Sequence, residues 1–144
     1  MEDQVLPLIS VGFCMTSDSA DLEKISEVLN LIPSKSRRKN EWPQVSIEAG
    51  IACDSWEINT KQVTSMSVDA ECNKLIDILK GKEVVIQSLC KEYNMKTHFE
   101  VIIHMNSNET PAIFLETETV TFLATINANI GFDIYTYDAG TDSE

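Results

Sequence analysis

The sequence lacks positive charge over its last third, because Thr97 to Glu144 contains no lysine or arginine. That stretch carries eight of the 23 acidic residues. The first 96 residues hold 15 acidic and 11 basic residues, so most of the net charge of −12 lies in the C-terminal third. A field of that sign repels nucleic acid and anionic membranes and attracts a basic partner. The charge pattern therefore argues against a protein that binds nucleic acid or lipid.

Other features that the sequence lacks exclude several kinds of catalytic, metal-binding and membrane protein. Only five glycines are present, and no glycine-rich phosphate-binding motif, serine-hydrolase motif or zinc-protease motif occurs. The four cysteines lie 39, 19 and 18 residues apart with no CxxC pair, which predicts reduced, mostly buried thiols instead of a zinc site or disulfides. No run approaches the roughly 18 apolar residues of a membrane span, and the acidic N-terminus is unlike a signal peptide. We expect a cytoplasmic protein that needs no metal or organic cofactor.

The length and hydrophobic content of the sequence are sufficient for one hydrophobic core. A chain of 144 residues with 43% hydrophobic content fits a single domain spanning 1–144, with a polar, frayed tail over 138–144. Strand-like and helix-like patterns alternate without a linker or repeat, which predicts an α+β fold with a mostly antiparallel sheet and about three helices packed on one face. Helices are expected at about 20–31, over 67–94 as one kinked helix or two, and from 117 to about 129. Strands are expected at 5–15, 45–48, 54–60, 96–105, 112–115 and 132–137, with a loop at 34–44.

Capping residues set the expected helix ends. Ser17–Ser19 offers caps for the first helix, and Pro33 is expected to stop it. Ser67 and Thr117 are expected to cap the later helices, and Asn94 to end the second helical stretch.

The strand at 96–105 has the clearest pattern, since apolar and polar residues alternate with the period of a half-buried strand. His98, Glu100 and His104 share one face of it. His98 and Glu100 could share a metal. The two histidines near a carboxylate could also do general acid–base work on RNA, although no lysine or arginine in this third of the chain would hold a phosphodiester. A solvated polar face is the favoured interpretation. The residues expected to be buried are Phe99, Val101, Ile103 and Met105.

Two other segments leave alternatives open. The basic cluster Lys35–Lys39 is either a solvated loop or a site for phosphate or an acidic surface, and Trp42 beside it is either an exposed anchor or a cap on the core. Trp56 is expected in the core. In the last strand, Tyr135 and Tyr137 lie opposite Phe132 and Ile134. If that tyrosine face is open, it makes an interface hot spot, and if a helix covers it, the tyrosines are core.

Several of these segments together resemble the bacterial domain-of-unknown-function 4279 family over roughly residues 8–137. The similar motifs are Ile25–Pro33 after the first strand, Trp56–Thr60, the helical stretch Leu75–Tyr93, and Gly131–Tyr135. Asn30 and Asn40 stand where the family pattern suggests glycine. The resemblance implies the fold and a bacterial origin but no established activity. Some small acidic bacterial proteins of this kind are immunity proteins for secreted toxins.

We therefore expect a non-enzymatic acidic binding protein, an immunity protein that neutralises a basic toxin or nuclease domain. We expect a monomer or weak dimer that binds neither nucleic acid nor membrane. The alternative is a small enzyme or ligand-binding domain that uses His98, Glu100 and His104. The expected partner surface consists of Glu100, Glu116, Glu118, Asp133, Tyr135 and Tyr137.

Overall fold

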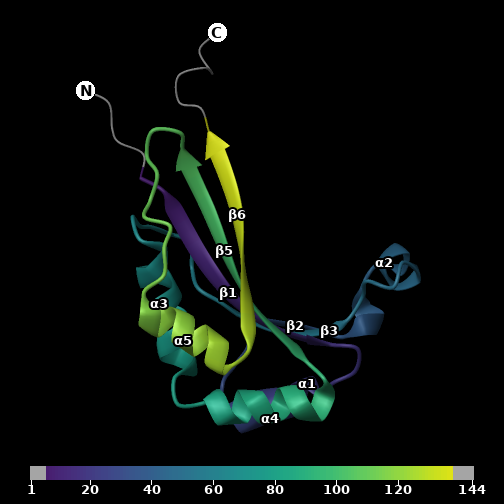
Figure 1. Cartoon of the computed structure of the whole chain (residues 1–144). Coiled ribbons are helices and arrows are strands. Elements are labelled where there is room, and N and C mark those ends of the chain that lie inside the picture. The colour runs from purple at the N-terminus through teal and green to yellow at the C-terminus, as the bar shows by residue number, and fades with distance from the viewer. Residues whose placement is uncertain (1–5, 138–144) are drawn as a thin grey trace.

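One sheet of six strands organises the chain in a computed structural model that describes residues 6–137 (Figure 1). The predicted frayed tail, 138–144, lies outside the described residues. The elements are β1 (Leu8–Ser17), α1 (Leu22–Leu29), β2 (Lys35–Arg37), the 3-10 helix η1 (Lys39–Glu41), α2 (Gln44–Glu48), β3 (Asp54–Asn59), β4 (Val63–Thr64), α3 (Val68–Leu79), α4 (Glu83–Tyr93), β5 (Lys96–Asn106), α5 (Thr117–Thr125) and β6 (Ala128–Tyr137).

The strand order is β2-β3-β1-β5-β6, with β4 paired to β1 beside β3. All pairs are antiparallel except β5 with β6, which are parallel because the chain returns through α5 before it enters β6. The predicted α+β class and mostly antiparallel sheet are therefore confirmed. The expected number of about three helices was too low, since the described residues contain five α-helices. Gly81, with φ +86°, separates α3 from α4, which settles the choice between one helix and two.

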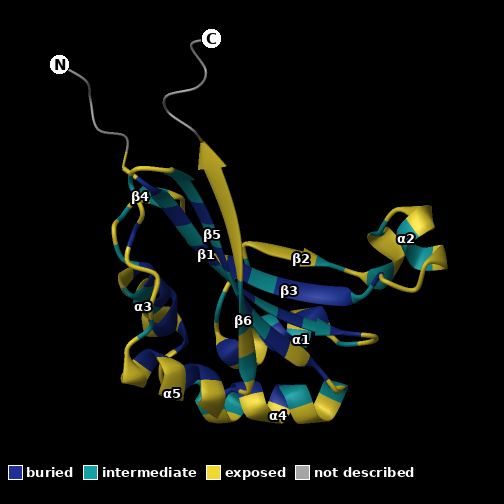
Figure 2. Ribbon diagram, turned by 45° about the horizontal axis from the view of Figure 1, so that its top comes forward, coloured by how far each residue is buried: buried dark blue, intermediate teal, exposed yellow. Residues whose placement is uncertain are grey.

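Helices cover only one face of the sheet. We call α1, α3, α4 and α5 together the helix layer; they lie on one side of the strands, whereas α2 lies apart beyond the end of β2 and β3 (Figures 1 and 2). Alternate residues of β1 and β5 point into the core under this layer, and Phe13 and Phe99 contact edge to face at 5.7 Å. Trp56 is fully buried and its Nε1 donates to Ser26 Oγ at 2.9 Å, so its predicted core position is confirmed.

The predicted burial pattern of β5 holds with one exception. Phe99, Val101 and Ile103 are 0% exposed, whereas Met105 is only half-buried near the end of the strand. Simple alternation explains the three buried residues, since a slip of one residue would bury charged groups without partners.

Two predicted strands are wrong. Residues 45–48 belong to the short helix α2, because the carbonyl of Pro43 accepts from the N–H groups of Ser46 and Ile47 and so begins a helical turn. Residues 112–115 contain only an isolated bridge, between Ala112 and Ser67. Conversely, β2 lies within the predicted loop at 34–44, because it pairs with β3, a partner that a local pattern does not show.

Helix ends follow side-chain chemistry, but not always at the expected residue. Ser67 caps α3 and Asn94 ends α4 as predicted. Asp21, not Ser17–Ser19, caps α1 by accepting from Lys24 N–H at 3.1 Å, and α1 ends at Asn30 before Pro33 can act. Asn30 has φ 56°, a left-handed conformation that glycine usually supplies. Glu116, not Thr117, occupies the N-cap position of α5.

Candidate functional site

The candidate site is the open face, which we define as the side of the sheet turned away from the helix layer. The register places residues from four strands in rows across it: Glu57, Cys14, His98 and Asn129 form one row, and Asn59, Gly12, Glu100 and Gly131 the next. These side chains are half-buried or exposed. Continuing toward the end of β6, the open face carries Ser10, Ile102, Asp133, His104, Tyr135 and Tyr137.

His98 is the most constrained polar group there. Its Nε2 lies 2.5 Å from Oε1 of Glu100, and its Nδ1 faces Oδ1 of Asn129 on β6. Gly131 makes room for this arrangement, because a Cβ at that position would lie 2.9 Å from Glu100 Oε1 and 3.1 Å from His98 Cε1. Both ring nitrogens therefore face acceptor oxygens, which suits an imidazolium that donates from both.

Opposing effects act on the pKa of His98. Partial burial lowers it, but the hydrogen bonds to Glu100 and Asn129 and the negative charges of Glu100 and Asp133 outweigh burial and raise the pKa above its ordinary value. His98 and Glu100 form an ion pair within β5 when the imidazole is protonated, and the contact of His98 with Asn129 joins β5 to β6.

A hollow of about 510 Å³ lies beside this pair on the open face. Glu57 and Glu100 line it, together with the side chain of Cys14. Burial, with Glu57 and Cys53 nearby, raises the pKa of the Cys14 thiol to about 12, so the thiol stays protonated near neutral pH and is a poor nucleophile. The hollow has the dimensions of a small-ligand site but contains no activated thiol.

The second cluster on the open face is aromatic, and we call it the tyrosine strip: His104, Tyr135 and Tyr137. The His104 ring stacks on Tyr135 with centroids 4.8 Å apart and on Tyr137 at 6.0 Å. Its Nδ1 also lies 2.8 Å from the Tyr137 hydroxyl. Tyr135 and Tyr137 remain 49% and 52% exposed, so this face is open and not covered by a helix. The stacking holds exposed aromatic rings in place, which lowers the entropy lost when a partner binds them.

The structure divides the predicted partner surface. Glu100, Asp133, Tyr135 and Tyr137 share the open face. Glu116 and Glu118 lie at the start of α5, which packs in the helix layer on the other side of the sheet. His104 likewise does not join His98 and Glu100, because it contacts the tyrosines instead. Sequence reasoning missed Asn129 and Gly131, although extending the last strand's alternation back to 128 would have placed both on this face.

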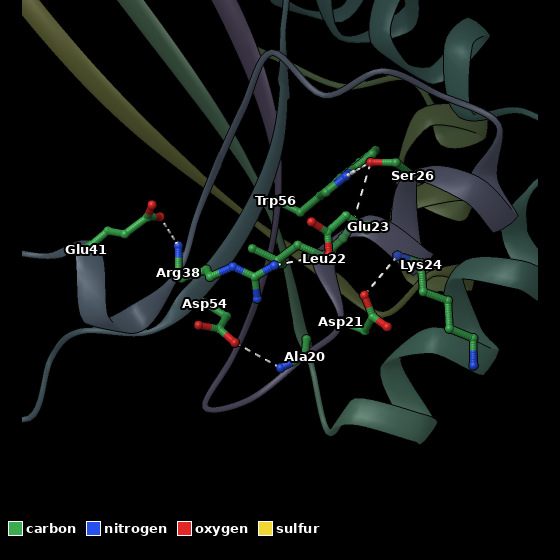
Figure 3. Close-up of polar contacts among 10 residues, drawn as sticks. All are labelled: Ala20, Asp21, Leu22, Glu23, Lys24, Ser26, Arg38, Glu41, Asp54 and Trp56. Atoms are coloured by element: carbon green, nitrogen blue, oxygen red, sulfur yellow. Dashed lines mark hydrogen bonds and ion pairs between the residues drawn. The ribbon is translucent and has the colours of Figure 1, made fainter.

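Three of the four basic side chains in the cluster make contacts within the chain, and Figure 3 shows those of Arg38. Arg38 Nη2 pairs with Glu23 Oε1 at 3.1 Å, and Lys39 Nζ pairs with Asp18 Oδ1 at 2.5 Å. The Arg37 guanidinium lies 3.9 Å from the centre of the Trp42 ring. The cluster therefore fastens the segment after β2 to the start of α1, which weakens the phosphate-site interpretation.

The remaining cysteines are free thiols. Cys72 is buried, and burial, with Asp69 and Glu71 nearby, raises its pKa to about 12. Cys14, Cys53 and Cys90 are only half-buried, so the expectation of mostly buried thiols was too strong.

Residues 6–137 contain no group of three or more His, Cys, Asp or Glu side chains placed to hold a metal ion. No helix in this described part is both long and apolar enough to cross a membrane.

Comparison with known proteins gives a family and no further relative. No curated protein and no solved structure matches the chain significantly. A family model described as "Domain of unknown function (DUF4279)" matches residues 7–137, which include every strand of the sheet and all of the open face. The protein belongs to the DUF4279 family.

Proposed function

We propose that this chain is a non-enzymatic acidic binding protein, and specifically a bacterial immunity protein that binds and neutralises a basic toxin or nuclease domain. In this proposal the partner contacts the open face of β5 and β6. The observation that carries it is the tyrosine strip, two exposed tyrosines ordered by His104 next to Asp133.

Ordered aromatic residues suit this role. Tyrosine is enriched among the few residues that carry most of the binding energy in protein interfaces. A tyrosine that is already stacked in the free protein loses less rotamer freedom on binding. Tyr137 and Tyr135 therefore provide anchors that a broad, shallow face can use without a deep pocket.

Charge supports a basic partner. No lysine or arginine occurs from Thr97 onward, so Asp133 has no basic side chain nearby in sequence, and the nearest one to Glu100 is Lys96, four residues before it. His98 offsets Glu100 within the face. Such a field speeds the encounter with a basic protein and slows it for an acidic one, with a strong dependence on salt.

The test first asks whether the gene immediately upstream encodes a large secreted protein with a basic C-terminal domain. It then measures association and dissociation rates with that neighbour-encoded domain. Tyr135→Ala and Tyr137→Ala should each speed dissociation about 10-fold to 100-fold, as expected for hot-spot residues. The double variant Glu57→Lys, Asp133→Lys should slow association at low salt and flatten its salt dependence.

A matched control is available in the helix layer. Glu116→Lys, Glu118→Lys changes the net charge by the same amount on the opposite side of the sheet, and it should slow association less than the open-face variant. Equal slowing would mean that overall charge, and not the open face, guides the partner. Lysozyme is a control for non-specific attraction to a basic protein, and it should bind weakly or not at all. Absence of binding to the neighbour-encoded domain would reject the proposal.

The hollow beside His98 favours the second candidate, a small enzyme or ligand-binding domain using His98, Glu100 and His104. Both ring nitrogens of His98 face acceptors, so neither is free to take a proton unless Glu100 or Asn129 moves. A fluorogenic RNA distinguishes the two functions. Cleavage by the wild type that His98→Gln abolishes would favour the enzyme, whereas equal background rates would favour the binding protein.

A further inference from the structure

The outer edge of β6 is free of any strand within the described chain. β6 ends the sheet, and it pairs with β5 through ten consecutive residues, from Thr97 with Ala128 to Asn106 with Tyr137. Figure 2 shows exposed residues along the length of β6 toward Tyr137, in contrast to the buried strands beside it. Phe132 and Ile134 on its helix side are 39% and 45% exposed, so the helix layer does not reach over this half of the strand.

The direction of the free main-chain groups follows from one hydrogen bond. The Tyr137 carbonyl accepts from the N–H of Ser107, just beyond the end of β5, at 3.1 Å, so the main chain of Tyr137 faces β5. The N–H and C=O groups of successive strand residues alternate between the two sides of the strand. Those of Phe132, Ile134 and Thr136 therefore point away from the sheet and form a row of free donors and acceptors.

This edge has none of the usual protections. Edge strands are normally short, bulged, or marked by lysine or proline, because an open row of main-chain groups recruits other strands. β6 is ten residues long, contains no lysine or proline, and keeps its register with β5 without interruption. An edge of this kind, with four exposed apolar or aromatic side chains, suits a strand-shaped ligand.

We propose that the outer edge of β6, from Phe132 to Thr136, binds an extended basic strand of the partner as an additional strand of the sheet. This inference rests on the proposed function and specifies how the partner docks. On the open face the added strand would place side chains beside Asp133 and Tyr135, and on the other face beside Phe132 and Ile134. A strand that alternates basic and apolar residues fits both faces.

Charge selects this occupant over a second copy of the chain. Two copies would bring together chains of net charge −12 along a segment without a basic residue, and a basic strand would meet the opposite field.

A proline at Thr136 tests the edge directly. The Thr136 N–H points outward, so Thr136→Pro removes one free donor and blocks close approach without removing a bond to β5. Thr136→Val is the matched control, because it keeps the N–H and a β-branched side chain. With the neighbour-encoded basic domain, Thr136→Pro should weaken binding at least about 10-fold. Thr136→Val should change it less than about twofold, and thermal melting should show both variants folded.

Amide hydrogen exchange provides a measurement that needs no variant. In the free chain the amides of Phe132, Ile134 and Thr136 should exchange quickly, and in the complex slowly. The amides of Asp133 and Tyr135 face β5 and should be protected in both states.

The outcomes separate the two proposals. If Thr136→Pro binds like the wild type while Tyr135→Ala weakens binding, strand addition is wrong and the proposed function stands. If the edge amides are protected in the free chain and sedimentation shows a dimer, the occupant is a second copy, which also overturns the inference. If the wild type does not bind the basic domain, both proposals fail.

Discussion

The two edges of the sheet are built in opposite ways. β2, at one end, has only three residues, follows Pro33, and carries Lys35 and Arg37. β6, at the other end, has ten residues, no lysine and no proline, and exposed aromatic side chains. Short length and basic residues prevent unwanted strand pairing, so β2 is protected and β6 is not. Among the described strands, β6 is therefore the long edge that lacks these protections.

The comparison also shows that a cluster of charged residues in the sequence is not always free to bind, because its side chains can already be paired within the chain. The basic cluster near β2 looks like a binding site until its contacts are seen, because Arg38 and Lys39 are paired with acidic residues of the same chain. Asp133 in β6 is exposed, and no lysine or arginine occurs from Thr97 onward. The charges of Arg38 and Lys39 are thus neutralised within the chain, whereas Asp133 is exposed in a part of the sequence without lysine or arginine.

The largest expected effect is the loss of stability when a side chain of the central strand β5 is truncated, compared with the same change in β6. Phe99→Ala should lower the free energy of unfolding by about 3–5 kcal/mol, because Phe99 is 0% exposed and its removal leaves a cavity. Phe132→Ala, at 39% exposure, should cost only about 1 kcal/mol. Urea denaturation measures both. Equal losses of unfolding free energy would mean that Phe132 is as well covered as Phe99, which would contradict an open helix side of β6.

The β2 end should depend on one buried carboxylate. Asp54 accepts from the N–H groups of Ala20 at 3.0 Å and Lys39 at 2.6 Å, so it ties the segment after β2 to the start of α1. Asp54→Ala leaves both groups without an acceptor and should lower the free energy of unfolding by about 2–3 kcal/mol. Asp54→Asn keeps one acceptor oxygen and should cost less. A loss under about 0.5 kcal/mol for Asp54→Ala would show that water replaces the carboxylate.

Periodicity predicted those elements whose pattern of apolar and polar residues lies within one segment of the chain. The alternation of 96–105 and the Gly81 break were readable because burial and backbone freedom repeat locally. β2 and the parallel pairing of β5 with β6 were not, since they depend on partners distant in the chain. α2 was mistaken for a strand because four residues are too few to show a period.

The candidate site was predictable in composition but not in arrangement. The sequence singled out Glu100, Asp133, Tyr135 and Tyr137, which the register of β5 with β6 brings to one face. Glu116 and Glu118 begin α5 in the helix layer, and the helix predicted from 117 already indicated this for Glu118. The sequence left open which face of the last strand the helices cover. Nor could it show the contact of His98 with Asn129, which exists only through the β5–β6 pairing.

A smaller effect tests the inner side of β6, where it meets β5. In Gly131→Ala the new methyl group would lie 2.9 Å from Glu100 Oε1 and 3.1 Å from His98 Cε1, so the pair must shift. The variant should lose about 1 kcal/mol of stability, as for mild overpacking, and the pKa of His98 should fall. Thr136→Ala, on the exposed part of the same strand, is the control and should change neither quantity. An unchanged pKa of His98 in Gly131→Ala would show that the pair adjusts freely.

The smallest effect is a pH dependence centred on His98. Burial lowers its pKa in the folded chain, but the hydrogen bonds to Glu100 and Asn129 and the charges of Glu100 and Asp133 raise it overall. Its neighbour on β1 is Cys14, a protonated thiol. Because the folded pKa exceeds the unfolded value of about 6.5, protonation favours the folded state. The stabilisation is complete below about pH 6.5 and is lost as pH rises through the folded pKa.

The effect should stay below about 1 kcal/mol, since the His98 side chain is 39% exposed and water screens the pair. Unfolding by urea at a series of pH values, with the His98 ring titrated by nuclear magnetic resonance, measures it. Glu100→Gln should lower the pKa of His98 and flatten the dependence, and Asn129→Ala should do so more weakly, because only Glu100 adds a full charge. If stability instead rose with pH over this window, His98 would be neutral in the fold, and its contact with Glu100 would not be an ion pair.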